Sequence, residues 1–250
     1  MSEDRVKSGI LGLDELMEGG FPRGFSYAIV GGPGSGKTTF GAQFLYKGTT
    51  VYGENGIYLT FDEPPYSISN NMRRFNWNFY DMENRGKLAF IDASPIMGEV
   101  PGKYIIRSGL RGTEPFSIDG VIGLINDVRR KVDARRCVID FISALQLRLR
   151  DDFEVREQTL MLTKALTEMR LTTILLAENL EERADVQRFG ITEFLAQGVI
   201  LLHVYRIGDS SVRALEIRKM RGVKHLEKLC PFKITSDGIE VYPQQAVFVR

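Results

Sequence analysis

Apolar residues in this chain follow two kinds of pattern that alternate along its length. Short continuous apolar runs, typical of strands buried on both faces, are separated by longer stretches whose apolar residues recur at helical spacing. The stretches 118–132 and 162–169 carry such stripes, which favour helices packed against a sheet. Strands are predicted at residues 25–30, 56–61, 88–92, 137–140, 172–177, 198–205 and 212–219, and helices at 38–47, 67–75, 118–132 and 153–170.

The order of these elements predicts the architecture. Because strands and helices alternate, we expect an α/β fold with a mostly parallel central sheet and helices on both faces. From residue 198 to 249 strands follow one another, so the C-terminal part is predicted to be β-rich, with Asp237-Gly238 as the turn of a hairpin. Residues 93–117 contain several prolines and glycines without a clear period, and they are predicted to form a long functional or disordered loop.

Composition narrows the class of protein. A chain of 250 residues with 43% hydrophobic residues suits one large domain, here residues 1–250 with a lead-in over 1–24. The net charge of +1 predicts no general attraction to nucleic acids or membranes, and the longest apolar run, near Gly198, is too short to span a bilayer. The polar start is not a signal peptide, and two cysteines without metal or disulfide spacing favour a reducing cytoplasm.

The clearest chemical signal is the sequence Gly-Gly-Pro-Gly-Ser-Gly-Lys-Thr at residues 31–38, directly after a predicted strand. It matches the pattern G-x-x-x-x-G-K-[ST], in which glycines let backbone N–H groups surround a phosphate chain. Lys37 is predicted to reach the β- and γ-phosphates, and the helix that follows presents its N-terminus to the same anion. A dinucleotide fingerprint is excluded because Lys37 stands where its third glycine would be. We therefore expect a nucleoside triphosphate to be bound by Gly31, Gly32, Pro33, Gly34, Ser35, Gly36, Lys37, Thr38 and Thr39.

A metal site is predicted beside this loop. The Thr38 hydroxyl is expected to ligate Mg²⁺. Residues 136–140 form a short apolar strand that ends in Asp140, and ligands of parallel sheets lie at the carboxyl ends of the strands. Asp140 is therefore predicted to meet the same Mg²⁺, directly or through water. The alternative is that Asp140 caps the following segment, 141–144.

Two adjacent acids follow another predicted strand. Asp62 and Glu63 come after the apolar run 57–60, so they are expected at the same edge of the sheet. Hydrolysis needs a carboxylate that orients and deprotonates the attacking water, and Glu63 is predicted to be this base with Asp62 as its neighbour. The alternative is that both acids serve the entry of a helix that has proline in its first turn.

A further predicted strand ends at Glu178-Asn179. These two residues are either a sensor of the γ-phosphate or a solvated strand terminus.

Two cations lie at the end of the predicted strand 212–219. Lys219 and Arg221 are two residues apart, so an extended chain would place both on the same side. Such a pair can stabilise charge that develops on a γ-phosphate, although an ordinary charged edge strand would look the same. The residues with a predicted catalytic role are Glu63, Asp62, Lys37, Lys219 and Arg221.

Several segments, taken together, resemble one family, the KaiC-type single-domain ATPases of the RecA superfamily. The resemblance covers nearly the whole chain and rests on residues 8–24, 61–63, 74–77, 86–95, 193–202 and 215–222, in this order. It implies a RecA-like P-loop NTPase core that binds ATP and Mg²⁺. It also implies a ring of identical subunits, typically a hexamer, with ATP at each interface and with Lys219 and Arg221 offered in trans to the neighbour's ATP.

Two departures from the family limit what is implied. The first of the paired acids is Asp62 rather than Glu, so Glu63 is the firmer assignment of the base. The clock protein of the family is a tandem duplication with a phosphorylated Ser-Thr pair, whereas this chain holds one copy and reads Thr192-Glu-Phe-Leu in the matching region. Neither self-phosphorylation nor timekeeping is therefore expected.

Three functions remain open. The first is an ATP-hydrolysing cytoplasmic ring that acts as a slow switch or assembly platform. The second is a DNA-binding recombinase paralogue; residues 180–190 are of mixed charge, although Arg148, Arg150 and the segment 103–111 supply cations. The third is a module that binds ATP without much hydrolysis and signals to an unidentified protein partner through the loop at 93–117.

Overall fold

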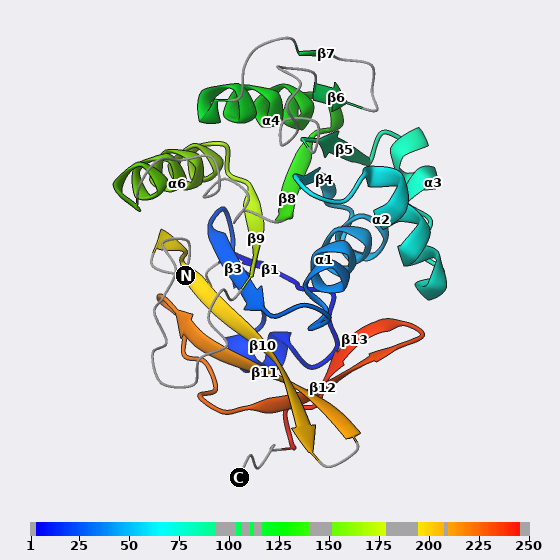
Figure 1. Cartoon of the computed structure of the whole chain (residues 1–250), viewed down its shortest axis with the longest axis vertical. Helices are drawn as coiled ribbons and strands as arrows, with labels where there is room; N and C mark the ends of the chain where they lie inside the picture. The colour runs from blue at the N-terminus through cyan, green and yellow to red at the C-terminus, as the bar shows by residue number, and fades with distance from the viewer. Residues whose placement is uncertain are drawn as a thin grey trace.

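The computed structural model describes residues 4–93, 104–106, 111–112, 117–140, 152–178, 195–207 and 210–245. In this part of the chain one large sheet has the strand order β13-β12-β11-β10-β3-β9-β8-β4-β5-β6-β7 (Figure 1). The strands are β3 (Ser26–Gly31), β4 (Asn55–Thr60), β5 (Leu88–Asp92), β6 (Tyr104–Ile106), β7 (Arg111–Gly112), β8 (Ala134–Asp140), β9 (Thr172–Glu178), β10 (Gly198–Ile207), β11 (Ser210–Met220), β12 (Cys230–Thr235) and β13 (Gly238–Val241).

The central strands of the sheet are parallel. From β10 through β3, β9, β8 and β4 to β5, every neighbouring pair is parallel, whereas the pairs outside this block are antiparallel. The predicted class, a mostly parallel α/β sheet with a β-rich C-terminal part, is confirmed. The register places Gly31 opposite Glu178, and Thr60 opposite both Asp140 and Asp92. The ends of these strands therefore meet at one edge of the sheet.

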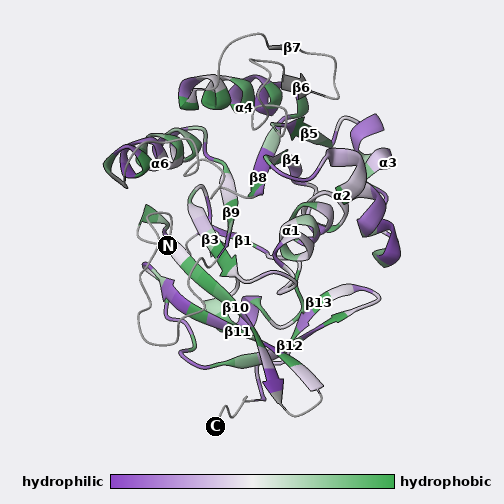
Figure 2. Cartoon of the chain, viewed as in Figure 1, coloured by the Kyte–Doolittle hydropathy of each residue, from purple (hydrophilic) through white to green (hydrophobic). Residues whose placement is uncertain are grey.

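Helices cover both faces of the sheet. On one face α1 (Lys37–Val51), α2 (Pro65–Met72) and α3 (Phe79–Asn84) share an apolar cluster with residues such as Tyr58 and Val138. On the other face α4 (Ile118–Val132) and α6 (Asp152–Glu168) pack on alternating strand residues such as Leu59 and Ile139. Figure 1 shows the two groups of helices on opposite sides of the strands, and Figure 2 shows both hydrophobic and hydrophilic residues around α4, as its stripe predicted. No helix in the described part of the chain is long and apolar enough to cross a membrane.

Some predicted boundaries were wrong. Helix α2 begins at Pro65 and passes into a short 3₁₀ turn, η2 (Arg73–Phe75), while α3 had no predicted counterpart. A small sheet of β1 (Arg5–Val6) and β2 (Phe21–Pro22) in the lead-in was also missed, together with the 3₁₀ turn η1 (Asp14–Met17) between them. Within the predicted loop at 93–117, β6 and β7 extend the sheet beyond β5, because backbone pairing there needs no apolar period. Apart from its first and last residues, Ala93 and Ser117, the rest of that loop lies outside the described residues.

The C-terminal hairpin packs beside the start of α1. Strands β12 and β13 pair as predicted, but the turn consists of Ser236 and Asp237, since Gly238 is already paired with Thr235. Gly238 has φ +113°, and a Cβ there would lie 2.4 Å from Gln43 Oε1, so only glycine fits without strain. Buried Gln43 of α1 accepts a hydrogen bond from Ile239 N (2.6 Å) and donates to Ile239 O (3.1 Å). The hairpin is thereby fixed to the helix that follows the phosphate loop.

A buried ion pair fixes the lead-in to the core. Arg136 on β8, with 1% of its side chain exposed, lies 2.6 Å from the carboxylate of Glu54. Its guanidinium also donates to the carbonyls of Lys7 (2.9 Å) and Phe44 (3.0 Å). Arg23 contacts the other Glu54 oxygen at 2.7 Å. The Glu54 carboxylate therefore joins two arginines between the lead-in, α1 and β8, and Arg23 has Asp4 as its second partner.

Candidate nucleotide-binding site

The predicted phosphate loop connects β3 to α1. Residues 32–36 form the turn between these elements, and α1 begins at Lys37, one residue before its predicted start. Gly34 has φ +71° and Gly36 has φ +102°, which are backbone conformations that residues with a Cβ rarely adopt. Gly36 is the N-cap of α1, so the unpaired N–H groups of the first helical turn point toward the loop. All nine residues of the predicted loop, 31–39, lie in this one segment.

The side chain of Lys37, the first residue of α1, lies against the loop. Its Nζ donates hydrogen bonds to the carbonyls of Gly31 (2.8 Å) and Gly32 (3.0 Å). Burial lowers the pKa of Lys37, while the negative charges of Glu178 and Asp140 act in the opposite direction. The ammonium group is therefore held between the loop and two carboxylates that end neighbouring strands.

Thr38 and Asp140 meet, as the sequence predicted. Thr38 Oγ1 donates to Asp140 Oδ2 at 3.3 Å, and the Tyr58 hydroxyl donates to the same oxygen at 2.5 Å. Burial raises the pKa of Asp140, although the hydrogen bonds from Tyr58 and Thr38 and the charge of Lys37 oppose this, and the charge of Glu63 adds to it. A hydroxyl and a carboxylate are the hard oxygen ligands that suit Mg²⁺, which takes few protein ligands when phosphates complete its shell. The donor set therefore fits that ion.

Tyr58 is a site residue that the sequence did not reveal. It is fully buried on β4 and packs on Phe90, so in the sequence it is one more apolar strand residue. Burial raises its pKa well above the usual value, and the charge of Asp140 adds to this effect. Its hydroxyl therefore stays protonated and donates to Asp140.

Tyr58→Phe is expected to lower the free energy of unfolding by about 1–2 kcal/mol, because half-buried Asp140 loses the shorter of its two hydrogen bonds. Urea unfolding of the purified protein measures this change. Tyr66→Phe is the matched control, since Tyr66 is 63% exposed and should change stability little. An unchanged midpoint in Tyr58→Phe would mean that this bond contributes no net stability.

The two predicted catalytic acids occupy different environments. Glu63 is half-buried, and its Oε1 accepts hydrogen bonds from Ser67 Oγ and from Asn71 Nδ2 (2.9 Å). Its charge contributes to the raised pKa values of both Asp140 and Tyr58, and Phe61 N, two residues before Glu63, donates to the Asp140 carbonyl at 3.4 Å. Asp62 is exposed. Both acids thus follow the end of β4, which is paired with Asp140 at the end of β8, and Glu63 rather than Asp62 has a half-buried, hydrogen-bonded carboxylate.

Lys219 and Arg221 lie far from the phosphate loop of their own chain. Strand β11 ends at Met220, so Arg221 stands in the following turn and is exposed. Lys219 Nζ donates to the Ala196 carbonyl at 2.7 Å, and burial followed by the charge of Arg221 lowers the pKa of Lys219. The charges of the two cations act on each other, but the strand ends before Arg221, so the predicted placement of both on one side of an extended strand does not apply.

The register shows where this pair stands. Val199 of β10 is opposite Lys219 on one side and Ala28 of β3 on the other, and Ala28 precedes Gly31 by three residues. Measured along the strand direction, Lys219 is therefore offset by about 10 Å from the phosphate loop. Because β11 runs antiparallel to β10, its carboxyl end is at the edge opposite to the predicted nucleotide site.

Arg213 is a second residue that the sequence analysis missed. It lies on β11, and its Nη2 donates to the Gly34 carbonyl at 3.4 Å, which places a guanidinium beside the phosphate loop. No local motif marks this residue, since its position follows from the order of strands in the sheet. Other predicted candidates lie outside the described residues, namely 141–144, Arg148, Arg150, Asn179, 180–190, Thr192 and most of 103–111.

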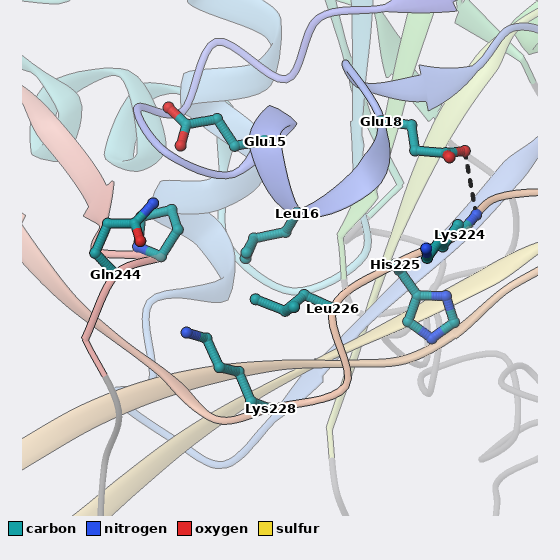
Figure 3. Close-up of a pocket in the computed structure, with 9 residues that line it drawn as sticks. Glu15, Leu16, Glu18, Lys224, His225, Leu226, Lys228 and Gln244 are labelled. Carbon is teal, nitrogen blue, oxygen red and sulfur yellow. Dashed lines mark hydrogen bonds between the residues drawn. The ribbon is translucent and has the colours of Figure 1, made fainter.

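An open hollow of about 500 Å³ lies elsewhere on the molecule (Figure 3). It is formed by η1, the segment after β11 and the chain end near Gln244, and Figure 3 shows Leu16 and Leu226 between charged side chains. The backbone N–H of Lys224 donates to Glu18 at 3.2 Å across its rim. None of the predicted site residues lines this hollow, so it is separate from the phosphate loop.

Comparison with known proteins gives a consistent result. The family described as "ATPase: KaiC" matches residues 6–246. The chain is 37% identical over 98% of its length to the circadian clock protein KaiC3 of Synechocystis sp., and 33% identical over 97% of its length to the circadian clock oscillator protein KaiC of Synechococcus elongatus. It spans 46% and 45% of these two proteins, about half of each.

A solved structure agrees with the fold. The crystal structure of a KaiC-like protein from the hyperthermophilic archaeon Pyrococcus horikoshii OT3 superposes with a TM-score of 0.80 and 40% sequence identity. The match covers 96% of this chain and 99% of that one. The predicted RecA-like core is therefore confirmed over nearly the whole length.

Proposed function

This chain belongs to the KaiC family of ATPases, and we propose that residues 1–250 act as a single domain that binds ATP with Mg²⁺ and hydrolyses it. The observation that carries the proposal is the meeting of Lys37, Thr38 and Asp140 at the ends of the parallel strands, with Glu63 just after β4, whose last residue is paired with Asp140. Phosphoryl transfer depends on positioning and on neutralising charge, and these residues supply both.

In the proposed reaction Glu63 takes a proton from the attacking water while the water oxygen bonds to the γ-phosphorus. The bond from that phosphorus to the bridging oxygen breaks, and ADP and inorganic phosphate are released. Lys37 and the first N–H groups of α1 bind the phosphate oxygens, and burial strengthens their electrostatic effect. Mg²⁺, held by Thr38 and Asp140, would add positive charge against the β- and γ-phosphates.

Steady-state ATP hydrolysis with Mg²⁺, measured with and without single-stranded DNA, tests this function. Turnover that is indifferent to DNA supports an autonomous ATPase. For such an ATPase we propose a regulatory role in the cytoplasm with a protein partner. Strong stimulation by DNA would favour the recombinase alternative. Binding of ATP without turnover would favour the module that only binds.

We also propose that the chain assembles into a ring, with a hexamer as the expected form, in which Lys219 and Arg221 reach a neighbour's ATP. The position of this pair at the far edge of the sheet supports action in trans, since it does not face its own phosphate loop. A guanidinium supplied by a neighbouring subunit stabilises transition-state charge only after assembly. Turnover per subunit should then rise with protein concentration.

Mixing two inactive variants should restore activity if the cations act in trans. An Arg221→Ala subunit keeps an intact phosphate loop, and a Lys37→Ala subunit keeps the intact cation pair. An interface between one subunit of each kind can therefore combine an intact loop with an intact cation pair. A random mixture is expected to recover roughly a quarter of the wild-type turnover, because each intact group is present with even odds. The matched control mixes Lys37→Ala with Glu63→Gln, whose defects fall in the same half of the interface and should not complement. Absence of recovery in the first mixture would contradict action in trans.

A further inference from the structure

The carboxylate of Glu63 is held by the helix that follows it. Ser67 Oγ and Asn71 Nδ2 both donate to the same oxygen, Oε1, the latter at 2.9 Å. Ser67 and Asn71 are four residues apart on α2, which places them on one helical face, one turn above the other. Two donors on one oxygen leave the acceptor sites of the other oxygen, Oε2, available.

The backbone around Glu63 is fixed as well. Thr60 Oγ1 donates to the Glu63 carbonyl at 2.8 Å, and the Thr60 carbonyl accepts from Ala93 N at 2.8 Å. Pro64 and Pro65 follow at the N-cap and first position of α2, where their restricted φ defines the direction in which the helix starts. The helix therefore begins directly after the acid and turns its own polar side chains back onto it.

Holding one oxygen matters because the last torsion of a glutamate side chain is soft. A terminal sp³–sp² torsion has broad energy wells, so an unrestrained carboxylate would rotate and present either oxygen in many directions. Two hydrogen bonds from one rigid helix select one orientation. Glu63 follows β4, whose last residue, Thr60, is paired with Asp140, so the oriented carboxylate lies at the strand ends where the γ-phosphate is proposed to bind.

We propose that Ser67 and Asn71 are positioning residues that hold Oε1 of Glu63 and leave Oε2 to accept the proton of the attacking water. This inference rests on the proposed ATPase function and on Glu63 as its base. Asn71 is exposed and Ser67 only partly buried, so their bonds to Glu63 add little to stability. Their effect is on the orientation of the base, and hence on the catalytic step.

Asn71→Ala and Ser67→Ala should each lower kcat by about 3- to 10-fold, and the double variant by more, while KM and the affinity for a fluorescent ATP analogue stay unchanged. Asn70→Ala is the matched control, because Asn70 is an exposed residue of the same helix that is not a donor to Glu63. Ser67→Thr, which keeps the hydroxyl, should retain most of the activity. Stability is measured in parallel by urea unfolding.

The decisive measurement combines Asn71→Ala with Glu63→Gln. If Asn71 acts through Glu63, its removal should change the residual turnover of Glu63→Gln by less than about 2-fold. An equal loss in both backgrounds, a loss expressed in KM, a kcat unchanged in both alanine variants, or a kcat that rises would overturn the positioning role. Absence of turnover in the wild type would instead refute the proposed function and the inference together, whereas full activity in Glu63→Gln would refute Glu63 as the base and, with it, the inference.

Discussion

Glu63→Gln is expected to lower ATP turnover by about 100- to 10,000-fold while ATP binding is retained. The amide has nearly the shape of the carboxylate and can still accept the hydrogen bonds from Ser67 and Asn71 at its oxygen. It cannot take a proton from water. The loss therefore falls on the chemical step, and the phosphate loop, 31–38, is untouched.

Two measurements on Glu63→Gln separate binding from chemistry. Single-turnover hydrolysis with Mg²⁺ gives the rate of the chemical step, and equilibrium titration with a fluorescent ATP analogue gives the affinity. Asp62→Asn is the matched variant, since it makes the same change one residue earlier on an exposed side chain, and a smaller loss is expected there. Full activity of Glu63→Gln would contradict its assignment as the base, and equal losses in both variants would mean that both acids take part.

Glu54→Ala is expected to lower the free energy of unfolding by about 3–5 kcal/mol. Arg136 is buried, and burial lowers its pKa against the opposing charge of Glu54, so the ion pair compensates a cation that water cannot reach. Without Glu54, Arg136 keeps its bonds to the carbonyls of Lys7 and Phe44 but has lost its counter-charge, and Arg23 loses a partner as well. A loss of this size is a large fraction of the stability of an ordinary domain.

Urea unfolding measures the effect of Glu54→Ala. Asp81→Ala is the control for an exposed ion pair, because Arg85 and Asp81 have side chains that are 60% and 37% exposed, and a change below about 1 kcal/mol is expected. The double variant Glu54→Leu/Arg136→Met should regain much of the lost stability, since it leaves no unpaired buried charge. A loss as small as that of Asp81→Ala would show that Arg136 does not depend on its counter-charge.

Much of the fold and part of the site could be predicted because the relevant signals are local. A phosphate loop is one continuous segment of strand, glycines and helix start, so residues 31–38 identify it without information from the rest of the chain. Asp140 and Glu63 were found because each follows an apolar run, and in a parallel sheet the ends of such runs meet. The meeting of Thr38 with Asp140 is confirmed by their hydrogen bond, whereas the catalytic roles stay predictions.

Other residues carry no local signal. In the sequence Tyr58 resembles any apolar strand residue, and only its hydrogen bond to Asp140 distinguishes it. Ser67 and Asn71 are ordinary polar residues of a helix, and only their hydrogen bonds to Glu63 distinguish them. Strands β6 and β7 were missed for a similar reason, since short edge strands are held by backbone pairing rather than by a pattern of side chains.

The sequence by itself determined the α/β class, the family and the edge of the sheet where phosphate chemistry is expected, because each depends on contiguous motifs or on a repeated apolar period. Only the tertiary structure decided which groups face one another. The antiparallel pairing of β11 with β10 sends Lys219 to the edge opposite its own phosphate loop, yet the same strand brings Arg213 to Gly34. Strand order and direction are set by packing across the whole chain, and no local pattern contains them.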